Sequence, residues 1–216
     1  MSKSKIFIVD DHPLVREWLT ALIDQTTDLK VCGGADDRQG ALHGIAQSSP
    51  DLAIIDLSLG GDSGIDLIRL IGEKFPKVAT VVLSMHDERV YAERSVRAGA
   101  RGYIMKREST TKVVEAIHEV LKGNIYLSKD LIELFAQKFI SGSGDASPIT
   151  QLSDRELEVF RFIGQGYETR EIAEMLKVNI KTVQTYCARI KEKLKLSSGA
   201  ELLREAMRWN NTNTVR

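Results

Sequence analysis

Residues 5–13 read KIFIVDDHP, and this stretch sets the pattern for the first half of the chain. A short apolar run stops at two acids, and a proline follows at a position that the first turn of a helix tolerates. Apolar runs of similar length, most of them rich in Val and Ile, recur at Leu29–Ala35, Asp51–Asp56, Ala79–Ser84 and Arg101–Lys106. Because helix-sized segments separate them, these runs indicate buried strands of one parallel sheet.

Five strand–helix units predict the fold class of this half. We expect an α/β domain over residues 1–123, with a doubly wound five-stranded parallel sheet in the flavodoxin-like order 2-1-3-4-5. Gly123 ends its last helix. The four prolines fall at expected element boundaries, which supports this segmentation: Pro13, Pro50, Pro76 and Pro148.

A linker that contains one helix is expected over residues 124–149. The helix begins after Ser128, a residue type that suits an N-cap, and continues through Phe139. The segment 141–150 reads SGSGDASPIT and consists mostly of Gly, Ser, Asp and Pro. This composition is typical of a flexible connection between domains.

The remaining residues, 150–216, predict a small all-α domain. Ser153 and Glu156 form a capping-box pattern at the start of its first helix. A short helix over Thr169–Leu176 and a longer one over Ile180–Leu194 follow, and one more helix completes the domain. A short helix, a tight turn and a longer helix make the helix-turn-helix pattern.

Composition places the chain among ordinary globular proteins. Of its 216 residues, 43% are hydrophobic and 28% are charged, which excludes a mostly disordered chain. No apolar run reaches the ~18 residues of a membrane-spanning helix, and the N-terminus lacks the apolar core of a signal peptide. Two isolated cysteines, Cys32 and Cys187, fit a reducing compartment, so we expect a cytoplasmic protein without a membrane partner.

The formal net charge of zero hides a difference between the two halves. Residues 1–149 carry net −3, whereas residues 150–216 carry net +3. Six basic residues and a single acid lie within 177–195. This locally basic segment favours a polyanion as the partner of the second half.

Polar residues share one placement in the predicted sheet, because each lies at the carboxyl end of a strand. Asp10 and Asp11 follow the first strand, Asp56 ends the third, Ser84 ends the fourth and Lys106 ends the fifth. In an open parallel sheet, this edge lines the ligand crevice. We therefore expect three carboxylates, one hydroxyl and one ammonium to lie together.

This set of groups fits phosphoryl transfer to an aspartate. Three neighbouring carboxylates repel one another and need a cation, and hard oxygen ligands suit Mg²⁺. A carboxylate beside Mg²⁺ can act as a nucleophile and form an aspartyl-phosphate. The metal, the ammonium and the hydroxyl would then stabilise the transferring phosphoryl oxygens.

The helix expected over Ile180–Leu194 has two different faces. Its apolar stripe, which we expect to pack inward, comprises Val183, Cys187, Ile190 and Leu194. The other positions suit a helix in the DNA major groove, and they include Lys181, Gln184, Thr185, Ala188, Arg189, Lys191 and Lys193. The four basic residues among them would neutralise phosphates, whereas Gln184 and Thr185 lie early in the helix, where base edges are read.

Four motifs of the first half, VDDHP, IIDLSLGGDSG, VVLS and GARGYIMK, resemble the receiver domain of bacterial two-component response regulators. The segment LSDRELEVFRFIGQGYETREIAEMLKVNIKTVQTYCARIKEKL is similar to the LuxR-type helix-turn-helix. In this order, the two blocks resemble the NarL/FixJ family of DNA-binding response regulators. The resemblance covers essentially the whole chain apart from the linker and the last few residues.

The resemblance implies a role for each residue of the acidic set. Asp56 would accept a phosphoryl group from the phosphohistidine of a sensor histidine kinase. Lys106 would pair with the phosphoryl oxygens, and Ser84 would hydrogen-bond one of them. Mg²⁺ would be held by Asp10, Asp11, Asp56 and the backbone carbonyl of Ser58.

The resemblance also implies roles outside the acidic set. Tyr103 matches the aromatic residue that turns inward on activation, and Ser58 and His86 match positions that tune the lifetime of the phosphate. The last helix, about Ser198–Trp209, would pair two DNA-binding domains. We therefore expect a homodimer on double-stranded promoter DNA, with RNA polymerase as a further partner. Base contacts would fall on Gln184, Thr185 and Ala188.

Two positions depart from the family's pattern. The segment after Asp56 reads Ser-Leu-Gly-Gly where the family usually has a Met-Pro pair, which indicates a looser loop. Arg107 follows Lys106 where many receivers have a proline, and the sequence leaves the isomer of that peptide bond open.

Two other functions remain open from the sequence. An atypical regulator of the same fold could act without phosphorylation, although the complete acidic set argues against it. An aspartyl-phosphate phosphatase would typically carry a second acid two residues after its nucleophile, where this chain has Ser58. We therefore expect a phosphorylation-controlled regulator of transcription and not a turnover enzyme.

Overall fold

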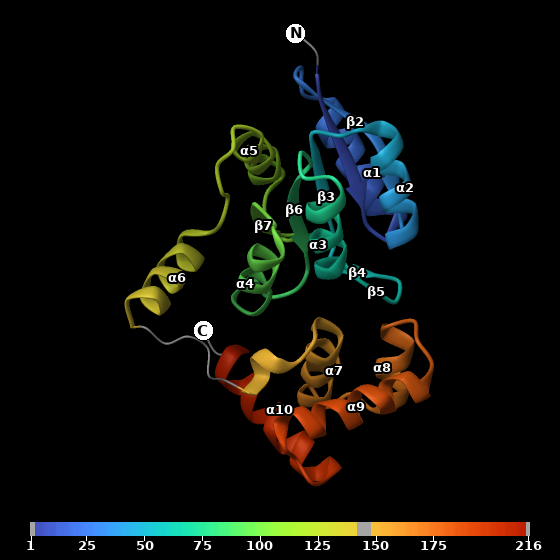
Figure 1. Cartoon of the computed structure of the whole chain (residues 1–216), viewed down its shortest axis with the longest axis vertical. Coiled ribbons are helices and arrows are strands. Elements are labelled where there is room, and N and C mark those ends of the chain that lie inside the picture. The colour runs from blue at the N-terminus through green and yellow to red at the C-terminus, as the bar shows by residue number, and fades with distance from the viewer. Residues whose placement is uncertain (1–2, 142–147, 215–216) are drawn as a thin grey trace. The chain divides into compact units, whose positions relative to one another are not determined.

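The computed structural model describes residues 3–141 and 148–214. The chain divides into two compact units, Met1–Phe135 and Ala136–Arg216 (Figure 1). The first unit is built from strands and helices, and the second is helical. The fold class predicted for each half is therefore confirmed.

A five-stranded parallel sheet forms the centre of the first unit (Figure 1). Its strands lie in the order β2-β1-β3-β6-β7, which is the expected order 2-1-3-4-5 counted over these five strands. Their bounds are β1 (Ser4–Val9), β2 (Leu29–Ala35), β3 (Leu52–Ile55), β6 (Ala79–Ser84) and β7 (Gly102–Met105). Every residue of β3 and β7 is buried, as expected where helices cover both faces of a sheet.

Five helices cover the sheet, namely α1 (Pro13–Asp24), α2 (Arg38–Ser48), α3 (Gly64–Lys74), α4 (Glu88–Ala98) and α5 (Thr110–Leu121). Side chains of α1 and α5 share one apolar core with the central strands. This core includes Leu19, Ile23, Ile117, Ile8 and Ile54, each at most 2% exposed. Burial of each such side chain contributes about 1.5–3 kcal/mol, so this core stabilises the packing of α1 and α5 against the sheet.

The first strand also carries a large ring, for which two glycines leave room. Phe7 of β1 is 2% exposed. A Cβ added at Gly33 of β2 or at Gly44 of α2 would lie 2.8 or 2.5 Å from an atom of the Phe7 ring. Glycine at both positions therefore lets β2 and α2 pack closely against Phe7.

A short hairpin follows Asp56 in place of the looser loop that the sequence indicates. β4 (Ser58–Leu59) and β5 (Asp62–Ser63) pair antiparallel across a two-residue turn. The turn residues Gly60 and Gly61 have φ values of 51° and 116°. Two-residue hairpin turns require such left-handed values, which glycine adopts without strain. The glycine pair thus builds a defined turn in the segment that follows Asp56.

The chain covers the outer edge of β7 after α5. The backbone N–H of Tyr126 donates to the carbonyl of Arg101 (2.9 Å), and the carbonyl of Tyr126 accepts from the N–H of Tyr103 (3.0 Å). Helix α6 (Lys129–Ser141) begins directly afterwards. The hydroxyl of Ser128 accepts a backbone N–H of its first turn (3.2 Å), as predicted for an N-cap.

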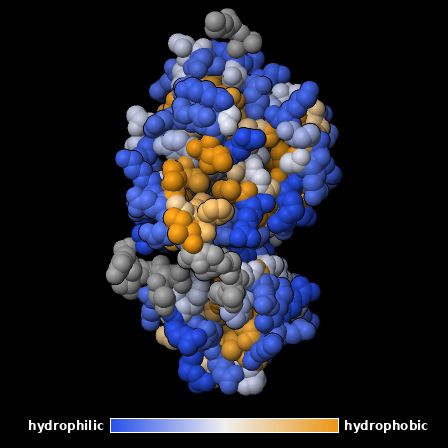
Figure 2. Space-filling model, turned by 60° about the vertical axis from the view of Figure 1, so that its left-hand side comes forward, coloured by the Kyte–Doolittle hydropathy of each residue, from blue (hydrophilic) through white to orange (hydrophobic). Residues whose placement is uncertain are grey.

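Helix α6 is amphipathic and exposes part of its apolar side. Leu131 is 1% exposed, whereas Ile132, Phe139 and Ile140 are 54%, 90% and 83% exposed. Figure 2 brings forward the side on which α6 lies in Figure 1, and apolar side chains gather on this face. Helix α6 therefore carries exposed apolar side chains along its own length.

The second unit contains a short 3₁₀ turn, η1 (Pro148–Gln151), and the helices α7 (Asp154–Gly164), α8 (Thr169–Met175), α9 (Ile180–Leu194) and α10 (Gly199–Thr214). The predicted capping box is present, because Ser153 accepts from the N–H of Glu156 and Glu156 accepts from the N–H of Ser153. Asn179 caps α9 as expected, accepting from the N–H of Thr182 (2.8 Å). None of the helices in the described ranges is long and apolar enough to cross a membrane.

Candidate functional site

The parallel strands bring the predicted acidic set to one edge of the sheet. Asp10 directly follows β1, Asp56 directly follows β3, and Ser84 is the last residue of β6. Backbone hydrogen bonds continue the pairing past the strand ends, from the N–H of Asp56 to Val9 (2.8 Å) and from the N–H of Lys106 to Ser84 (2.9 Å). The backbone therefore fixes where each of these side chains starts.

Lys106 lies between two buried carboxylates. Its Nζ is 2.6 Å from Oδ2 of Asp10 and 2.7 Å from Oδ2 of Asp56. Asp10 and Asp56 are 2% and 4% exposed. Among the described residues every peptide bond is trans, so the bond from Lys106 to Arg107 is trans as well.

The pKa values of Asp56 and Lys106 reflect the burial and the charges around each group. Burial raises the pKa of Asp56, and the nearby ammonium of Lys106 only partly opposes this. Burial acts to lower the pKa of Lys106, but the charges and hydrogen bonds of Asp56 and Asp10 outweigh it and raise the pKa. One ammonium thus serves two carboxylates, and the cluster retains an excess of negative charge that favours a further cation.

The donor set fits a hard divalent cation. One ligand atom from each of Asp10, Asp11, His12 and Asp56 can be chosen so that all four lie within 4.8 Å of one another. Carboxylate oxygens are the ligands that Mg²⁺ prefers in proteins. The structure therefore brings together the three acids that the sequence singles out for a metal. Sequence reasoning missed His12, although its position directly after the two acids pointed to it.

A buried hydrogen-bond network links Ser84, Tyr103 and Ser58 through His86. The hydroxyl of Ser84 accepts from the backbone N–H of His86 (3.2 Å), and the hydroxyl of Tyr103 donates to the carbonyl of His86 (2.9 Å). The side chains of Ser58 and His86 lie 2.8 Å apart, from Oγ to Nε2. Burial raises the pKa of Tyr103 well above its usual value, so the phenol stays a hydrogen-bond donor. Ser84, Tyr103 and Ser58 thus all contact His86, which lies two residues before the start of α4.

The backbone beyond Asp56 approaches a glycine too closely for any side chain. A Cβ at Gly64, the first residue of α3, would overlap the carbonyl oxygen of Asp56. The N–H of Gly64 also donates to the carbonyl of Leu57 (2.9 Å). Across the hairpin, Arg38 of α2 pairs with Asp62 (3.2 Å). These contacts hold the segment that follows Asp56.

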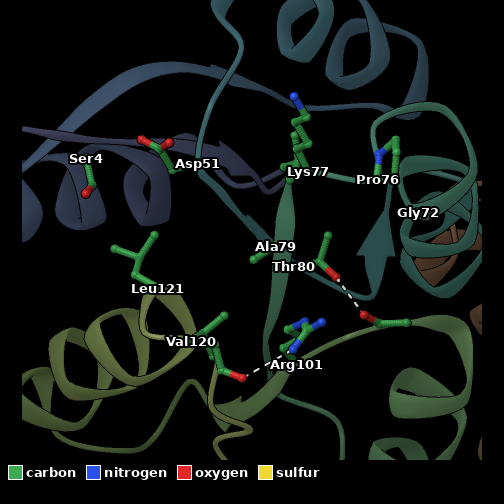
Figure 3. Close-up of a pocket in the computed structure, with 13 residues that line it drawn as sticks. Ser4, Asp51, Gly72, Pro76, Lys77, Ala79, Thr80, Arg101, Val120 and Leu121 are labelled. Atoms are coloured by element: carbon green, nitrogen blue, oxygen red, sulfur yellow. Dashed lines mark hydrogen bonds between the residues drawn. The ribbon is translucent and has the colours of Figure 1, made fainter.

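A separate cavity of about 550 Å³ lies in the first unit, and none of the predicted site residues lines it (Figure 3). Several of its polar groups are engaged internally. Thr80 Oγ1 donates to the carbonyl of Gly99 (3.4 Å), and the guanidinium of Arg101 donates to the carbonyl of Gly123 (3.3 Å). Asp51 accepts from the N–H of Lys5 (2.7 Å). The cavity is therefore separate from the acidic edge of the sheet.

Helix α9 presents most of the predicted DNA contacts to solvent. The apolar stripe faces inward as expected, with Val183 and Ile190 fully buried and Cys187 and Leu194 half-buried. The exposed side chains are Lys181, Gln184, Thr185, Ala188 and Arg189, whereas Lys191 and Lys193 are half-buried. The roles of these seven residues in DNA binding remain predictions.

Two family models match the chain. Residues 6–118 match the response regulator receiver domain, and residues 150–206 match the bacterial regulatory proteins of the luxR family. The oxygen regulatory protein NreC of Staphylococcus carnosus (strain TM300) is 35% identical over 210 residues, which cover 94% of this chain and 97% of that protein. NreC of Staphylococcus aureus (strain MRSA252) is 34% identical over the same shares.

Solved structures show the same architecture. A two-component response regulator of the LuxR family from Aurantimonas sp. SI85-9A1 is 31% identical, with a TM-score of 0.60 over 64% of this chain and 99% of that chain. The RcsB response regulator of Salmonella typhimurium is 26% identical, with a TM-score of 0.58 over 95% and 98%. A complex of the response regulator RcsB with DNA is 25% identical, with a TM-score of 0.59 over 94% and 97%. Relatives of this chain thus share the order of its two units.

Proposed function

Since this chain belongs to the NarL/FixJ family of response regulators, with a receiver domain followed by a LuxR-type DNA-binding domain, we propose that it accepts a phosphoryl group on Asp56 and thereby controls promoter binding. The observation that carries this proposal is the shared ammonium of Lys106 between the buried carboxylates of Asp10 and Asp56. These are the groups that phosphoryl transfer to an aspartate needs, placed within hydrogen-bond distance of one another.

The proposed transfer runs from a phosphohistidine of a partner sensor kinase to Asp56. A carboxylate oxygen of Asp56 bonds to phosphorus as the bond from phosphorus to the kinase imidazole breaks, and the imidazole nitrogen keeps that electron pair. Lys106 Nζ then exchanges its contact with Asp56 for one with a phosphoryl oxygen. Ser84 offers its hydroxyl to a second phosphoryl oxygen. Both groups stabilise charge that grows on these oxygens during transfer.

A Mg²⁺ ion completes the proposed site. The carboxylates of Asp10, Asp11 and Asp56 and the backbone carbonyl of Ser58 would hold it. When bound, it neutralises the phosphoryl oxygens and offsets the repulsion among the three acids. The excess negative charge left by a single ammonium supports this assignment.

The proposed switch starts at Ser84. If its hydroxyl turns toward the phosphoryl group, the hydrogen bond that it accepts from the N–H of His86 is lost or weakened. Tyr103 donates to the carbonyl of the same residue, so the change would reach both the buried Tyr103 ring and the segment that leads into α4. Phosphorylation would thereby shift an equilibrium between two receiver conformations.

The second unit is the proposed output. Lys181, Arg189, Lys191 and Lys193 would neutralise DNA phosphates, and Gln184, Thr185 and Ala188 would face the bases. Leu203 and Met207 of α10 are 41% and 47% exposed and lie one helical turn apart. We propose that this apolar pair joins two copies, so that two α9 helices enter successive major grooves of promoter DNA. RNA polymerase is then a candidate partner at the promoter.

Two rival functions are less well supported. Ser58 stands where aspartyl-phosphate phosphatases typically carry a general acid, and its hydroxyl contacts His86. A phosphorylation-independent regulator would have no use for the cluster of Lys106 with two buried acids. We therefore propose a regulator and not a turnover enzyme.

DNA selection under phosphoryl-mimicking conditions tests the proposal. The full chain and its Asp56→Asn variant are each offered random-sequence DNA, with and without beryllofluoride plus Mg²⁺. Beryllofluoride stands in for the phosphoryl group on an aspartate. We expect it to raise specific binding by the unchanged chain only. Equal binding of the same sites by the unchanged chain with and without beryllofluoride would contradict control through Asp56, while leaving the DNA-binding function intact.

A further inference from the structure

We propose that His12 is a further ligand of the metal site beside Asp56. Its imidazole would give the site a higher affinity for divalent transition metals than the carboxylates alone provide. This inference rests on the metal site of the proposed function, because it concerns which ions that site accepts.

His12 is held in place by its backbone. It is the N-cap of α1, and its N–H donates to Oδ1 of Asp10 (2.9 Å). Pro13 follows at the first helical position, where its ring restricts the backbone. Arg16, one turn further on, donates from its guanidinium to the backbone carbonyl of Asp10 (2.5 Å). The segment that carries both acids is thus tied to the first turn of α1.

The imidazole of His12 reaches the acids directly. Its Nδ1 is 2.8 Å from Oδ1 of Asp11 and 3.3 Å from Oδ1 of Asp10. Lys106 contacts the other oxygen of Asp10, Oδ2. The imidazole and the ammonium therefore approach Asp10 through different oxygens and do not compete for the same one.

These distances match the geometry of a shared ion. In an octahedral site with metal–ligand bonds of about 2.1 Å, neighbouring donors lie about 3.0 Å apart and opposite donors about 4.2 Å apart. The two separations from Nδ1 bracket the first value. The spread of 4.8 Å for the set of Asp10, Asp11, His12 and Asp56 exceeds the second by little. Small rotations of the side chains would place all four around one cation.

An imidazole nitrogen changes which ions such a site prefers. Mg²⁺ favours oxygen ligands and keeps much of its water, so a nitrogen donor adds little to its binding affinity. Divalent iron, cobalt, nickel and zinc bind imidazole well, and their affinities generally exceed those of Mn²⁺. A site with three carboxylates and one imidazole should therefore bind these metals more tightly than three carboxylates alone.

The alternative is that His12 only pairs with the carboxylates and never binds the metal. In that case the imidazole competes with every divalent ion for the same oxygens. Removing it would then strengthen the binding of Mg²⁺ and of transition metals alike. If His12 is a metal ligand, its removal should instead weaken the binding of a transition metal. One substitution therefore distinguishes the two roles of His12.

Calorimetric titration of the full chain with Co²⁺ and with Mg²⁺ tests the inference. The variants are His12→Ala and, as a matched control, His43→Ala, which removes an exposed imidazole of α2. We expect His12→Ala to weaken Co²⁺ binding by about tenfold or more and to change Mg²⁺ binding by less than about threefold. Proton NMR of the Co²⁺-loaded chain should show paramagnetically shifted imidazole resonances, which persist in His43→Ala and vanish in His12→Ala.

The results separate this inference from the proposed function. If His12→Ala binds Co²⁺ as tightly as the unchanged chain or more tightly, or no shifted imidazole resonance appears, His12 is not a ligand. In that case an Asp56→Asn variant that loses affinity for both ions would still support the proposed metal site. If neither ion binds the unchanged chain, both the metal site and the role of His12 are wrong.

Discussion

Lys193 donates a hydrogen bond to the buried carboxylate of Glu156, with Nζ 2.5 Å from Oε2, and thereby joins α9 to the first turn of α7. The same carboxylate accepts from the N–H of Ser153 (2.7 Å), so it caps one helix and anchors another. Lys193 was expected to contact DNA phosphate, but here its ammonium serves the packing of the second unit. Any contact of Lys193 with DNA would have to share or give up this bond.

Glu156 should make the second unit sensitive to acid. Burial acts to raise the pKa of Glu156, but hydrogen bonds from Lys193 and from Ser153 outweigh it and lower the pKa below its ordinary 4.5. A carboxyl whose pKa is lower in the folded state stabilises the fold above its unfolded pKa, and this contribution disappears as the pH falls through the folded pKa. We expect Glu156→Gln to lower the free energy of unfolding of the second unit by about 1–2 kcal/mol at neutral pH. This difference from the unchanged chain should shrink below pH 4.5.

Hydrogen exchange of backbone amides in α7 and α9 measures this effect, because it reports on the second unit alone. Glu201→Gln is the matched control. Glu201 also accepts hydrogen bonds at a helix start and has a lowered pKa, but these hydrogen bonds come from Ser197, which lies outside α9. A loss for Glu156→Gln that stays constant down to strongly acidic pH would show that the charge of Glu156 contributes nothing.

Lys106→Met should destabilise the first unit unless a metal is present. The substitution leaves the buried carboxylates of Asp10 and Asp56 without their ammonium, and an uncompensated buried charge costs about 3 kcal/mol. Urea unfolding in the presence of a chelator should show this loss, and Mg²⁺ should restore much of it. Lys112→Met removes an exposed partner of Glu108, and because solvent screens such surface pairs it should leave stability nearly unchanged. No difference between the two variants would argue against the shared ammonium.

Gly64→Ala should disturb the segment after Asp56. Because a Cβ would overlap the carbonyl oxygen of Asp56, the start of α3 must move away, at a cost of about 2–3 kcal/mol. We also expect slower labelling of Asp56 by a small phosphodonor such as acetyl phosphate. Gly72→Ala, in the same helix with open space around it, should instead stabilise by about 0.5–1 kcal/mol. Equal stability of the two variants would contradict the close approach.

Replacing Gln184 and replacing Lys181 by alanine should change DNA binding in different ways. Loss of Gln184 should relax the preference for one base pair by about 1–3 kcal/mol and leave non-specific affinity nearly unchanged. Loss of Lys181 should weaken binding to all sequences and reduce the salt dependence by about one phosphate contact. Fluorescence anisotropy with matched and mutated sites at several salt concentrations distinguishes them. If Gln184→Ala retains full discrimination at every position, Gln184 does not read bases.

The sheet and its acidic edge could be predicted from two patterns in the sequence. One is the set of apolar runs, and the other is the polar residue that ends each run. Buried parallel strands require continuous apolar runs, and such a run ends at Asp10, at Asp56 and at Ser84. Since parallel strands all end on one edge, the placement of these side chains follows from the topology alone. The capping box at Ser153 and the cap at Asn179 were equally accessible, because both depend on residues three positions apart.

Other features depend on contacts that no local pattern encodes. The hairpin at Gly60 and Gly61 needs left-handed backbone values, which composition permits but does not demand. The bond from Lys193 to Glu156 spans 37 positions, so helical periodicity could place both residues but not pair them. The sequence shows His12 next to the two acids, but it does not show where the imidazole points. That orientation depends on the position of His12 as the N-cap of α1.

The strand-like pairing of Tyr126 has a consequence for how the chain is made. Synthesis proceeds from the N-terminus, and domains generally fold as units while it does. The edge of β7 exposes unpaired backbone N–H and C=O groups until Tyr126 has left the ribosome and formed its hydrogen bonds with Arg101 and Tyr103. Until then, a strand of another chain could pair with this edge. A nascent chain that has emerged only as far as Gly123 would therefore hold all five strands of the sheet with one unprotected edge, and such an edge favours aggregation.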